Sequence, residues 1–239
     1  MAKIGKEAIN FRVQKMLHLR AKYEADLENA HVRLQPGNSK TGKACYTVSL
    51  IPIADCKNCR ECKKECYDIR NVCFQPTVQN DRARNSAIHR KDRERYWREI
   101  EVQLRANYIT QLRLNVGGDL DDEDFEYVAA IGARNPKCEI LFFTKNDDGC
   151  NRYIEMYLSV YPDNFGFPKN VHPLYSRWPG MEMKNPYHVP ESHVLWPDGS
   201  TTAPEFGSVY CGGNCSECYF EEKGCWALKA GESVILKAH

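Results

Sequence analysis

The sequence lacks features that would place it in several familiar classes. It has no apolar run long enough to cross a bilayer, and its first residues, Met-Ala-Lys-Ile-Gly-Lys-Glu, do not form the apolar region of a secretory signal. Its 33 Lys and Arg residues nearly balance 32 Asp and Glu residues, and the net charge of +1 is too small to attract nucleic acid or a membrane surface to the whole molecule. We therefore expect a cytoplasmic protein without membrane contact.

Cysteine, in contrast, is abundant, with 12 residues. In a reducing cytosol, clustered cysteines indicate metal ligands rather than disulfides. One group lies in a polar, charged stretch and has the spacing C-x2-C-x2-C-x3-C, with a further cysteine beyond it: Cys56, Cys59, Cys62, Cys66 and Cys73. Because this spacing is typical of ferredoxin-type loops, it favours a [4Fe–4S] cluster over zinc.

A second group lies near the other end of the sequence and comprises Cys211, Cys215, Cys218 and Cys225. Four thiolates predict a second metal site, and Gly212 and Gly213 would allow the chain to fold tightly around it. A second [4Fe–4S] cluster and a zinc knuckle both remain open here. The other cysteines, Cys45, Cys138 and Cys150, are isolated, and we expect them to be buried as small apolar residues.

Strand and helix patterns alternate along most of the chain. Apolar periodicity predicts helices at 7–30, 80–108, 121–134 and 150–161, and strands at 45–53, 111–117, 139–144, 170–178 and 193–196. The segment Gly37–Lys43 fits G-x4-G-K, but Ala44 and a strand follow it, so a turn is favoured over a phosphate-binding loop. The periodicity weakens after residue 161.

This order predicts an α/β fold with a mostly parallel sheet. We expect a helical segment at 1–36, an α/β unit at 37–200 that contains the cysteine loop, and a cysteine-rich module at 201–239. Right-handed crossovers place the carboxyl ends of parallel strands on one edge. The first cysteine loop, Gly117-Gly118-Asp119, Lys145 and Arg177 all follow strands, and this predicts a site on that edge.

Each of these residues also has a simpler interpretation. Gly117-Gly118-Asp119 could be a tight turn with an acidic helix cap, rather than a cofactor-binding segment. Lys145 and Arg177 could bind a carboxylate or phosphate, or be exposed loop ends. We interpret His172, His188 and His193 as structural, because they show no paired metal-ligand spacing.

A strand, a cysteine loop, a helix and a strand that ends in Gly-Gly-acid resemble the start of the radical S-adenosylmethionine partial barrel. This resemblance implies a partial TIM-barrel-like fold, a [4Fe–4S] cluster and S-adenosylmethionine held in part by Gly117-Gly118-Asp119. The sequence departs from the usual C-x3-C-x2-C spacing in the first loop. That spacing occurs instead at Cys211, Cys215 and Cys218.

Over more of its length the chain resembles the phage-encoded "gene product 88" family. The matching segments are Gly37-Asn38-Ser39-Lys40, Cys62-x3-Cys66-Tyr67, Val116-Gly117-Gly118-Asp119, Phe143-Thr144-Lys145, and Cys218 with Cys225-Trp226. This resemblance implies a phage or prophage origin and the cytoplasm of a bacterial host, but it implies no known reaction.

Two functions follow as hypotheses. The first is an iron–sulfur protein with one or two [4Fe–4S] clusters that cleaves S-adenosylmethionine reductively. The alternative is a non-enzymatic protein, stabilised by zinc or a cluster, that binds nucleic acid or a host protein through the basic helix 82–105. Because acidic residues are interleaved with the arginines of that helix, a solvated face with local ion pairs is favoured over a nucleic-acid surface.

Overall fold

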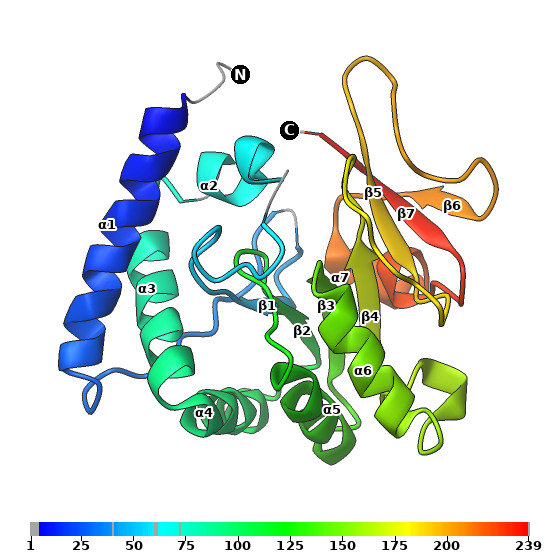
Figure 1. Ribbon diagram of the computed structural model, residues 1–239. Helices are drawn as coiled ribbons and strands as arrows, with labels where there is room; N and C mark the ends of the chain where they lie inside the picture. Colours follow the sequence, from blue (N-terminus) through cyan, green and yellow to red (C-terminus); the bar gives the residue numbers. More distant parts are fainter. Residues whose placement is uncertain (1–4, 40, 60–61, 72, 239) are drawn as a thin grey trace.

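A computed structural model describes residues 5–39, 41–59, 62–71 and 73–238. Its core is a seven-stranded, all-parallel sheet with the order β1-β2-β3-β4-β5-β7-β6 (Figure 1). The strands are β1 Cys45–Val48, β2 Gln111–Leu114, β3 Glu139–Thr144, β4 Val171–Ser176, β5 Glu191–Leu195, β6 Ser208–Tyr210 and β7 Ser233–Lys237. This confirms the α/β class with a parallel sheet, and in the described residues the sheet is open between β1 and β6.

Helices follow most of the strands. They are α1 Lys6–Ala25, α2 Tyr67–Asn71, α3 Pro76–Lys91, α4 Arg93–Ala106, α5 Asp124–Arg134, α6 Asp147–Tyr157 and α7 Cys215–Phe220, with short 3-10 turns η1 Cys62–Glu65, η2 Pro162–Asn164 and η3 Gly224–Trp226. Among the described residues, no helix is both long and apolar enough to span a membrane.

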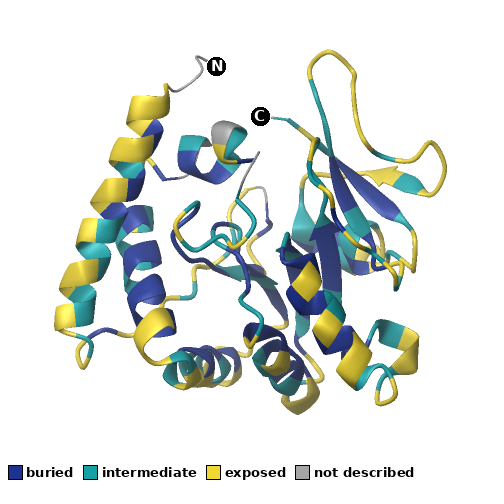
Figure 2. Cartoon of the chain, in the orientation of Figure 1, coloured by how far each residue is buried: buried dark blue, intermediate teal, exposed yellow. Residues whose placement is uncertain are grey.

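Two apolar clusters lie on opposite faces of the sheet, because successive side chains of a strand point to opposite faces. On one face Phe142 and its neighbours pack against α4, α5 and α6, for example through Trp97 and Phe125. On the other face Leu141 and Leu174 pack against Trp226 and the segment around α7. Figure 2 shows the burial concentrated in the strands and on the inward sides of these helices.

The first helix is fixed to the segment that contains the first cysteine loop. Its apolar side, which includes Met16, packs against Ile51 before that loop and Ile69 within it. Arg12 Nη1 donates to the carbonyl of Ile69 at 2.6 Å, and Arg20 Nη1 donates to Asp55 Oδ1 at 3.1 Å. Helix α1 therefore supports the loop from outside the sheet.

The structure corrects several predicted boundaries. The single helix predicted at 80–108 is two helices, α3 and α4, separated at Asp92, which has φ −150° and ψ 79° and whose side chain accepts a hydrogen bond from the amide of Arg95. An aspartate placed to cap a new helix ends the previous one. The strand predicted at 45–53 ends at Val48, and the predicted loop at 54–79 contains η1, α2 and the start of α3.

The C-terminal segment contributes to the same sheet. Strand β7 pairs with β5, and β6 pairs with β7. Residues 201–239 therefore share the sheet with residues 37–200. No strand is predicted at β6 or β7 from the sequence pattern.

Candidate metal centres

The first cysteine loop covers the carboxyl ends of β1, β2 and β3. The amide of Asp119, beyond β2, donates to the carbonyl of Asp55 at 2.8 Å. Asn58 Nδ2 donates to the carbonyl of Lys145, beyond β3, at 2.7 Å. The loop is therefore joined to the two neighbouring strand ends, on the edge where the parallel topology predicts a site.

Three thiols of this loop form a connected group. Cys59 Sγ lies 3.7 Å from Cys62 Sγ and also interacts with Cys56. The amide of Ile53 donates to Cys56 Sγ at 3.3 Å, and Ile53 has a φ of 70°. That backbone conformation costs a β-branched residue about 1–3 kcal/mol and is found where the surroundings require it. We call Cys56, Cys59 and Cys62, with the nearby Cys66, the loop centre.

Lys145 and Asp119 lie against the loop centre. Asp119 Oδ1 accepts from Thr144 Oγ1 at 2.7 Å and Oδ2 accepts from the amide of Lys145 at 2.9 Å, while Lys145 Nζ donates to Ser176 Oγ at 3.0 Å. The hydrogen bond with Cys59 has the largest effect on the pKa of Cys62 and lowers it. Burial acts to raise this pKa, the positive charge of Lys145 acts to lower it, and the resulting pKa is about 6. The thiolate is the form that binds metal, so this cation favours binding.

The other cysteines of this stretch have different surroundings. Burial raises the pKa of the Cys66 thiol to about 12, although it still interacts with Cys56 and Cys62. Cys73 Sγ is fully buried and donates to Asp68 Oδ2 at 3.5 Å. Asp68 forms a buried, bidentate ion pair with Arg82. Cys73 therefore belongs to this ion pair and not to the connected thiols.

The two glycines before Asp119 are required by packing. A Cβ at Gly117 would collide with Arg82 Nη1 and Asp68 Oδ2, and Gly118 has a φ of +83° with Leu50 against it. Of the residues predicted for this edge, Asp119 and Lys145 lie at the loop centre. Arg177 instead forms a bidentate ion pair with Glu191, with distances of 2.8 Å and 2.6 Å.

The second cysteine group lies on the face of the sheet opposite α4–α6. Cys211 follows β6, Cys215 begins α7, Cys218 is buried within α7, and Cys225 lies in η3. The amide of Gly213 donates to Cys211 Sγ at 3.4 Å. A Cβ at Gly212 would lie 3.3 Å from Cys218 Sγ, so glycine allows the expected tight fold. We call these four cysteines the second centre.

Arg113, on β2, directs its charge at the second centre. Its Nη1 lies 3.7 Å from Cys215 Sγ, and its guanidinium lies over the Phe143 ring at 4.8 Å from the centroid. In the described part of the chain Arg113 forms no ion pair with a carboxylate, and its Nε is buried without a partner. An enclosed guanidinium needs a counter-charge, and the sulfur atoms of this centre are the acids nearest to it.

Cys45 also belongs to this centre, and not to the isolated cysteines as predicted. It is fully buried at the start of β1 and interacts with Cys215. The interaction with Cys45 has the largest effect on the pKa of Cys215 and lowers it. Burial acts to raise this pKa, the positive charge of Arg113 acts to lower it, and the resulting pKa is about 6. The segment before Cys45 is the turn predicted at Gly37–Lys43. The carbonyl of Thr41 in this segment accepts hydrogen bonds from the amide and the hydroxyl of Ser216 in α7.

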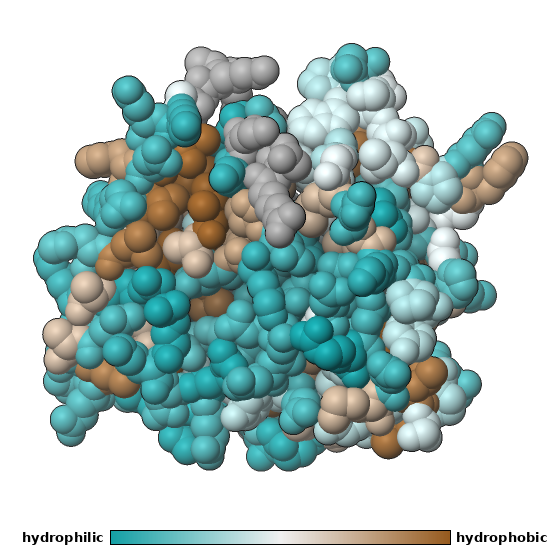
Figure 3. Space-filling model, viewed as in Figure 1, coloured by the Kyte–Doolittle hydropathy of each residue, from teal (hydrophilic) through white to brown (hydrophobic). Residues whose placement is uncertain are grey.

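The arginines of α3 and α4 are mostly paired within the chain. Arg82 pairs with Asp68, Arg93 with Asp121, and Arg95 with Glu99 and the carbonyl of Leu27. Figure 3 shows a largely hydrophilic surface on the face in view. These pairs match the interpretation of helix 82–105 as a face with local ion pairs.

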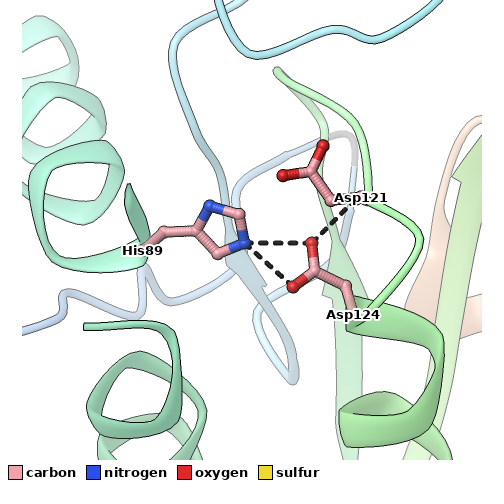
Figure 4. A group of neighbouring side chains, drawn as sticks. All are labelled: His89, Asp121 and Asp124. Carbon is pink, nitrogen blue, oxygen red and sulfur yellow. Dashed lines mark hydrogen bonds and ion pairs between the residues drawn. The ribbon is translucent and has the colours of Figure 1, made fainter. Parts of the chain in front are cut away.

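Sequence reasoning missed one group beside the loop centre. His89, Asp121 and Asp124 place a potential ligand atom each within 4.8 Å of the others (Figure 4). The sequence predicts only a helix at 121–134 for Asp121 and Asp124, and His89 has no sequence neighbour with metal-ligand spacing. The contact arises because α3 and the turn after β2 meet at the same edge.

A family model described as Gene product 88 matches residues 17–231, which include both centres. The chain belongs to the Gene product 88 family. No curated protein and no solved structure matches it. This confirms the resemblance drawn from the short motifs, several of which now have a structural role: Gly117 contacts the Asp68–Arg82 pair, and Lys145 lies against the thiols of the loop centre.

We expect Gly117→Ala to destabilise the protein by about 1–3 kcal/mol, because the added methyl group must displace the Asp68–Arg82 pair. Urea unfolding would measure this free energy. Gly5→Ala is the control, since nothing lies within 4 Å of the added Cβ, and its effect should stay within about 0.5 kcal/mol. Equal stability of the two variants would contradict the packing argument.

Proposed function

We propose that this phage-family protein binds a [4Fe–4S] cluster at the loop centre through Cys56, Cys59 and Cys62. The observation that carries the proposal is the connected group of three thiols beside Lys145 and Asp119, over the carboxyl ends of β1–β3. Three thiolates leave one iron without a protein thiolate. An open coordination position distinguishes reactive metal sites from structural ones.

The polar groups around the loop centre support a reactive site. The Lys145 ammonium offsets the negative charge of the thiolates, and Asp119 is held rigidly by Thr144 and two backbone amides. We infer that S-adenosylmethionine is the co-substrate; a [4Fe–4S] cluster held by these cysteines would, when reduced, supply the electron for its reductive cleavage. The resemblance of the strand–cysteine loop–helix–strand order to radical S-adenosylmethionine enzymes motivates this step.

The second centre fits a structural role. It offers four cysteine thiols, its turn is held by an amide-to-sulfur hydrogen bond, and Arg113 and Cys45 lie against it from the sheet. Closed sites with four thiolates stabilise folds. We propose zinc or a second [4Fe–4S] cluster there, with Arg113 as the positive charge that favours the thiolate forms.

Anaerobically purified protein should be brown and contain iron and sulfide in nearly equal amounts. Cys59→Ala and Cys62→Ala should each remove the iron of the loop centre, since each deletes a ligand. Cys73→Ala is the matched control and should keep it, because Cys73 contacts Asp68 instead. Metal analysis and visible absorption measure the difference. Colourless wild-type protein that contains only zinc would overturn the cluster assignment.

The reduced protein should cleave S-adenosylmethionine, and product formation can be followed by liquid chromatography. Cys59→Ala should abolish the cleavage. An intact cluster that does not bind this cofactor would leave electron transfer or a structural role. A salt-dependent complex with DNA or RNA, lost on neutralisation of Arg90, Lys91, Arg93 and Arg95, would favour the non-enzymatic alternative.

Arg113→Met should weaken metal binding at the second centre by about 10- to 100-fold, the usual effect of removing a group that supports metal ligands. Competition with a chelator measures the affinity. Arg134→Met is the control, because Arg134 is exposed and pairs with Glu101. If both variants retain metal equally, Arg113 does not support the thiolates.

A further inference from the structure

A cleft of about 130 Å³ opens beside the loop centre, between the cysteine loop and the end of α3. Its lining consists of Leu50, Ala54, Asp55, Cys56, Lys57, His89, Arg90, Asp119 and Asp121. Several of its polar groups already have partners within the chain. Asp55 accepts from Arg20 and the amide of Ile51, Lys57 pairs with Asp122, and Asp119 accepts from Thr144 and Lys145.

His89 is held against a buried carboxylate. His89 is 4% exposed, and its Nε2 lies 2.9 Å from both oxygens of Asp124, which is fully buried. Figure 4 shows the ring with Nε2 toward Asp124 and the other nitrogen, Nδ1, pointing away from it. Nδ1 makes no hydrogen bond with the residues that the structure describes. The free nitrogen therefore belongs to a side chain that lines the cleft.

The hydrogen bonds of Asp124 determine the state of His89. Asp124 Oδ1 accepts from Trp97 Nε1 at 3.0 Å, and Oδ2 accepts from the amide of Asp121 at 2.8 Å. Burial acts to raise the pKa of Asp124, but the hydrogen bond and charge of His89, with the bonds from Asp121 and Trp97, lower it overall. A carboxylate accepts only, so it fixes a proton on Nε2 and leaves the lone pair of a neutral imidazole on Nδ1.

The same three residues are poorly suited to bind a metal ion. Arg93 Nη2 pairs with Asp121 Oδ2 at 2.9 Å, and Arg93 Nε lies 3.4 Å from Asp124 Oδ1. One guanidinium thus already pairs with both carboxylates and offsets part of their charge. The Nε2 of His89, the nitrogen nearest to Asp124, is used in its hydrogen bond. A divalent cation would have to displace these interactions.

We propose that His89 accepts a proton from a small polar ligand in this cleft, and that Asp124 is the positioning residue that directs Nδ1 toward it. The ligand would present a hydroxyl or amine group. Its proton passes to Nδ1, the electron pair stays on the ligand oxygen or nitrogen, and the imidazolium is stabilised by Asp124. This role of His89 rests on the proposed function in one respect: the loop centre supplies the reactive end of the same cleft.

Other charged and titratable groups surround His89. Asp121 and Asp124 are its acidic neighbours, and Arg93, which pairs with both, is a basic group close by. The Tyr96 ring of α4 packs edge-on at a centroid distance of 5.0 Å, and Arg90 and Asp55 line the cleft beside the imidazole. The test therefore measures His89 itself rather than the pH dependence of the whole protein.

Diethyl pyrocarbonate, which acylates an accessible imidazole nitrogen that carries a lone pair, is the probe. It would be applied to the anaerobically purified full chain, and peptide mass spectrometry would follow modification of His89. Asp124→Asn can donate to Nε2 and move the ring proton to Nδ1, so we expect about a tenfold or greater loss in the rate at His89, as expected of a wrong tautomer. His172, bonded through Nε2 to Glu139 at 2.7 Å, is the internal control and should be unaffected.

The His89→Gln variant separates positioning from folding. A glutamine can keep the hydrogen bond to Asp124 but has no equivalent of Nδ1. We expect it to fold with wild-type thermal stability and to retain iron at the loop centre, so that a loss of reactivity in Asp124→Asn can be compared with a folded protein that lacks the imidazole.

Three results would overturn the proposal: an unreactive His89 in the wild type, equal rates in wild type and Asp124→Asn, or protection of His89 by stoichiometric Mn²⁺ or Zn²⁺ that is lost in Asp121→Asn. The modification rate does not require iron. A colourless protein with a reactive, Asp124-dependent His89 would therefore remove the cluster proposal alone.

Discussion

The arrangement of both centres depends on placing a positive side chain of the sheet against thiols. Lys145 follows β3 and lies against the loop centre, while Arg113 lies on β2 and against the second centre. Enclosing a lone ammonium or guanidinium costs several kcal/mol unless a negative group compensates it. The two cations and the cysteine thiolates therefore stabilise one another. Sulfur binds metal only as thiolate, so the same pairing would favour the metals proposed for both centres.

The two cations differ in ways that match the roles proposed for their centres. Lys145 has a compact ammonium that bonds Ser176 on one side and has Asp119 beside it. It can adjust as charge changes at a reactive centre. Arg113 is planar and stacked over Phe143, with its orientation fixed by the ring. A fixed guanidinium suits a centre that keeps a constant charge.

The sequence pattern predicts the strands β1 to β5, because buried parallel strands are short apolar runs bounded by turn residues. The limits of β3 agree with the prediction at both ends. The break at Asp92 was missed, since apolar periodicity continues across it and the capping hydrogen bond is a local geometric feature. The strands β6 and β7 were missed because the segment around them is rich in turn residues, and β6 has only three residues.

Site residues that carry a local sequence signal could be predicted, and those without one could not. Cysteine spacing and strand ends identified the loop centre, Asp119 and Lys145. No local pattern could identify Cys45 or His89, whose partners Cys215 and Asp124 lie far along the chain. Arg177 was predicted from its position at a strand end, but its ion pair with Glu191 depends on a strand that begins where β4 ends.

The contact between the turn before β1 and α7 has a consequence for the order of assembly during synthesis. Thr41 and Ser216 are 175 residues apart. Chains emerge from the ribosome N-terminus first, and a contact of such long sequence separation forms late. The strands β1–β3 and the loop centre can gather while the C-terminal quarter is still being translated. The second centre can close only afterwards, so one face of the nascent sheet stays uncovered until α7 arrives.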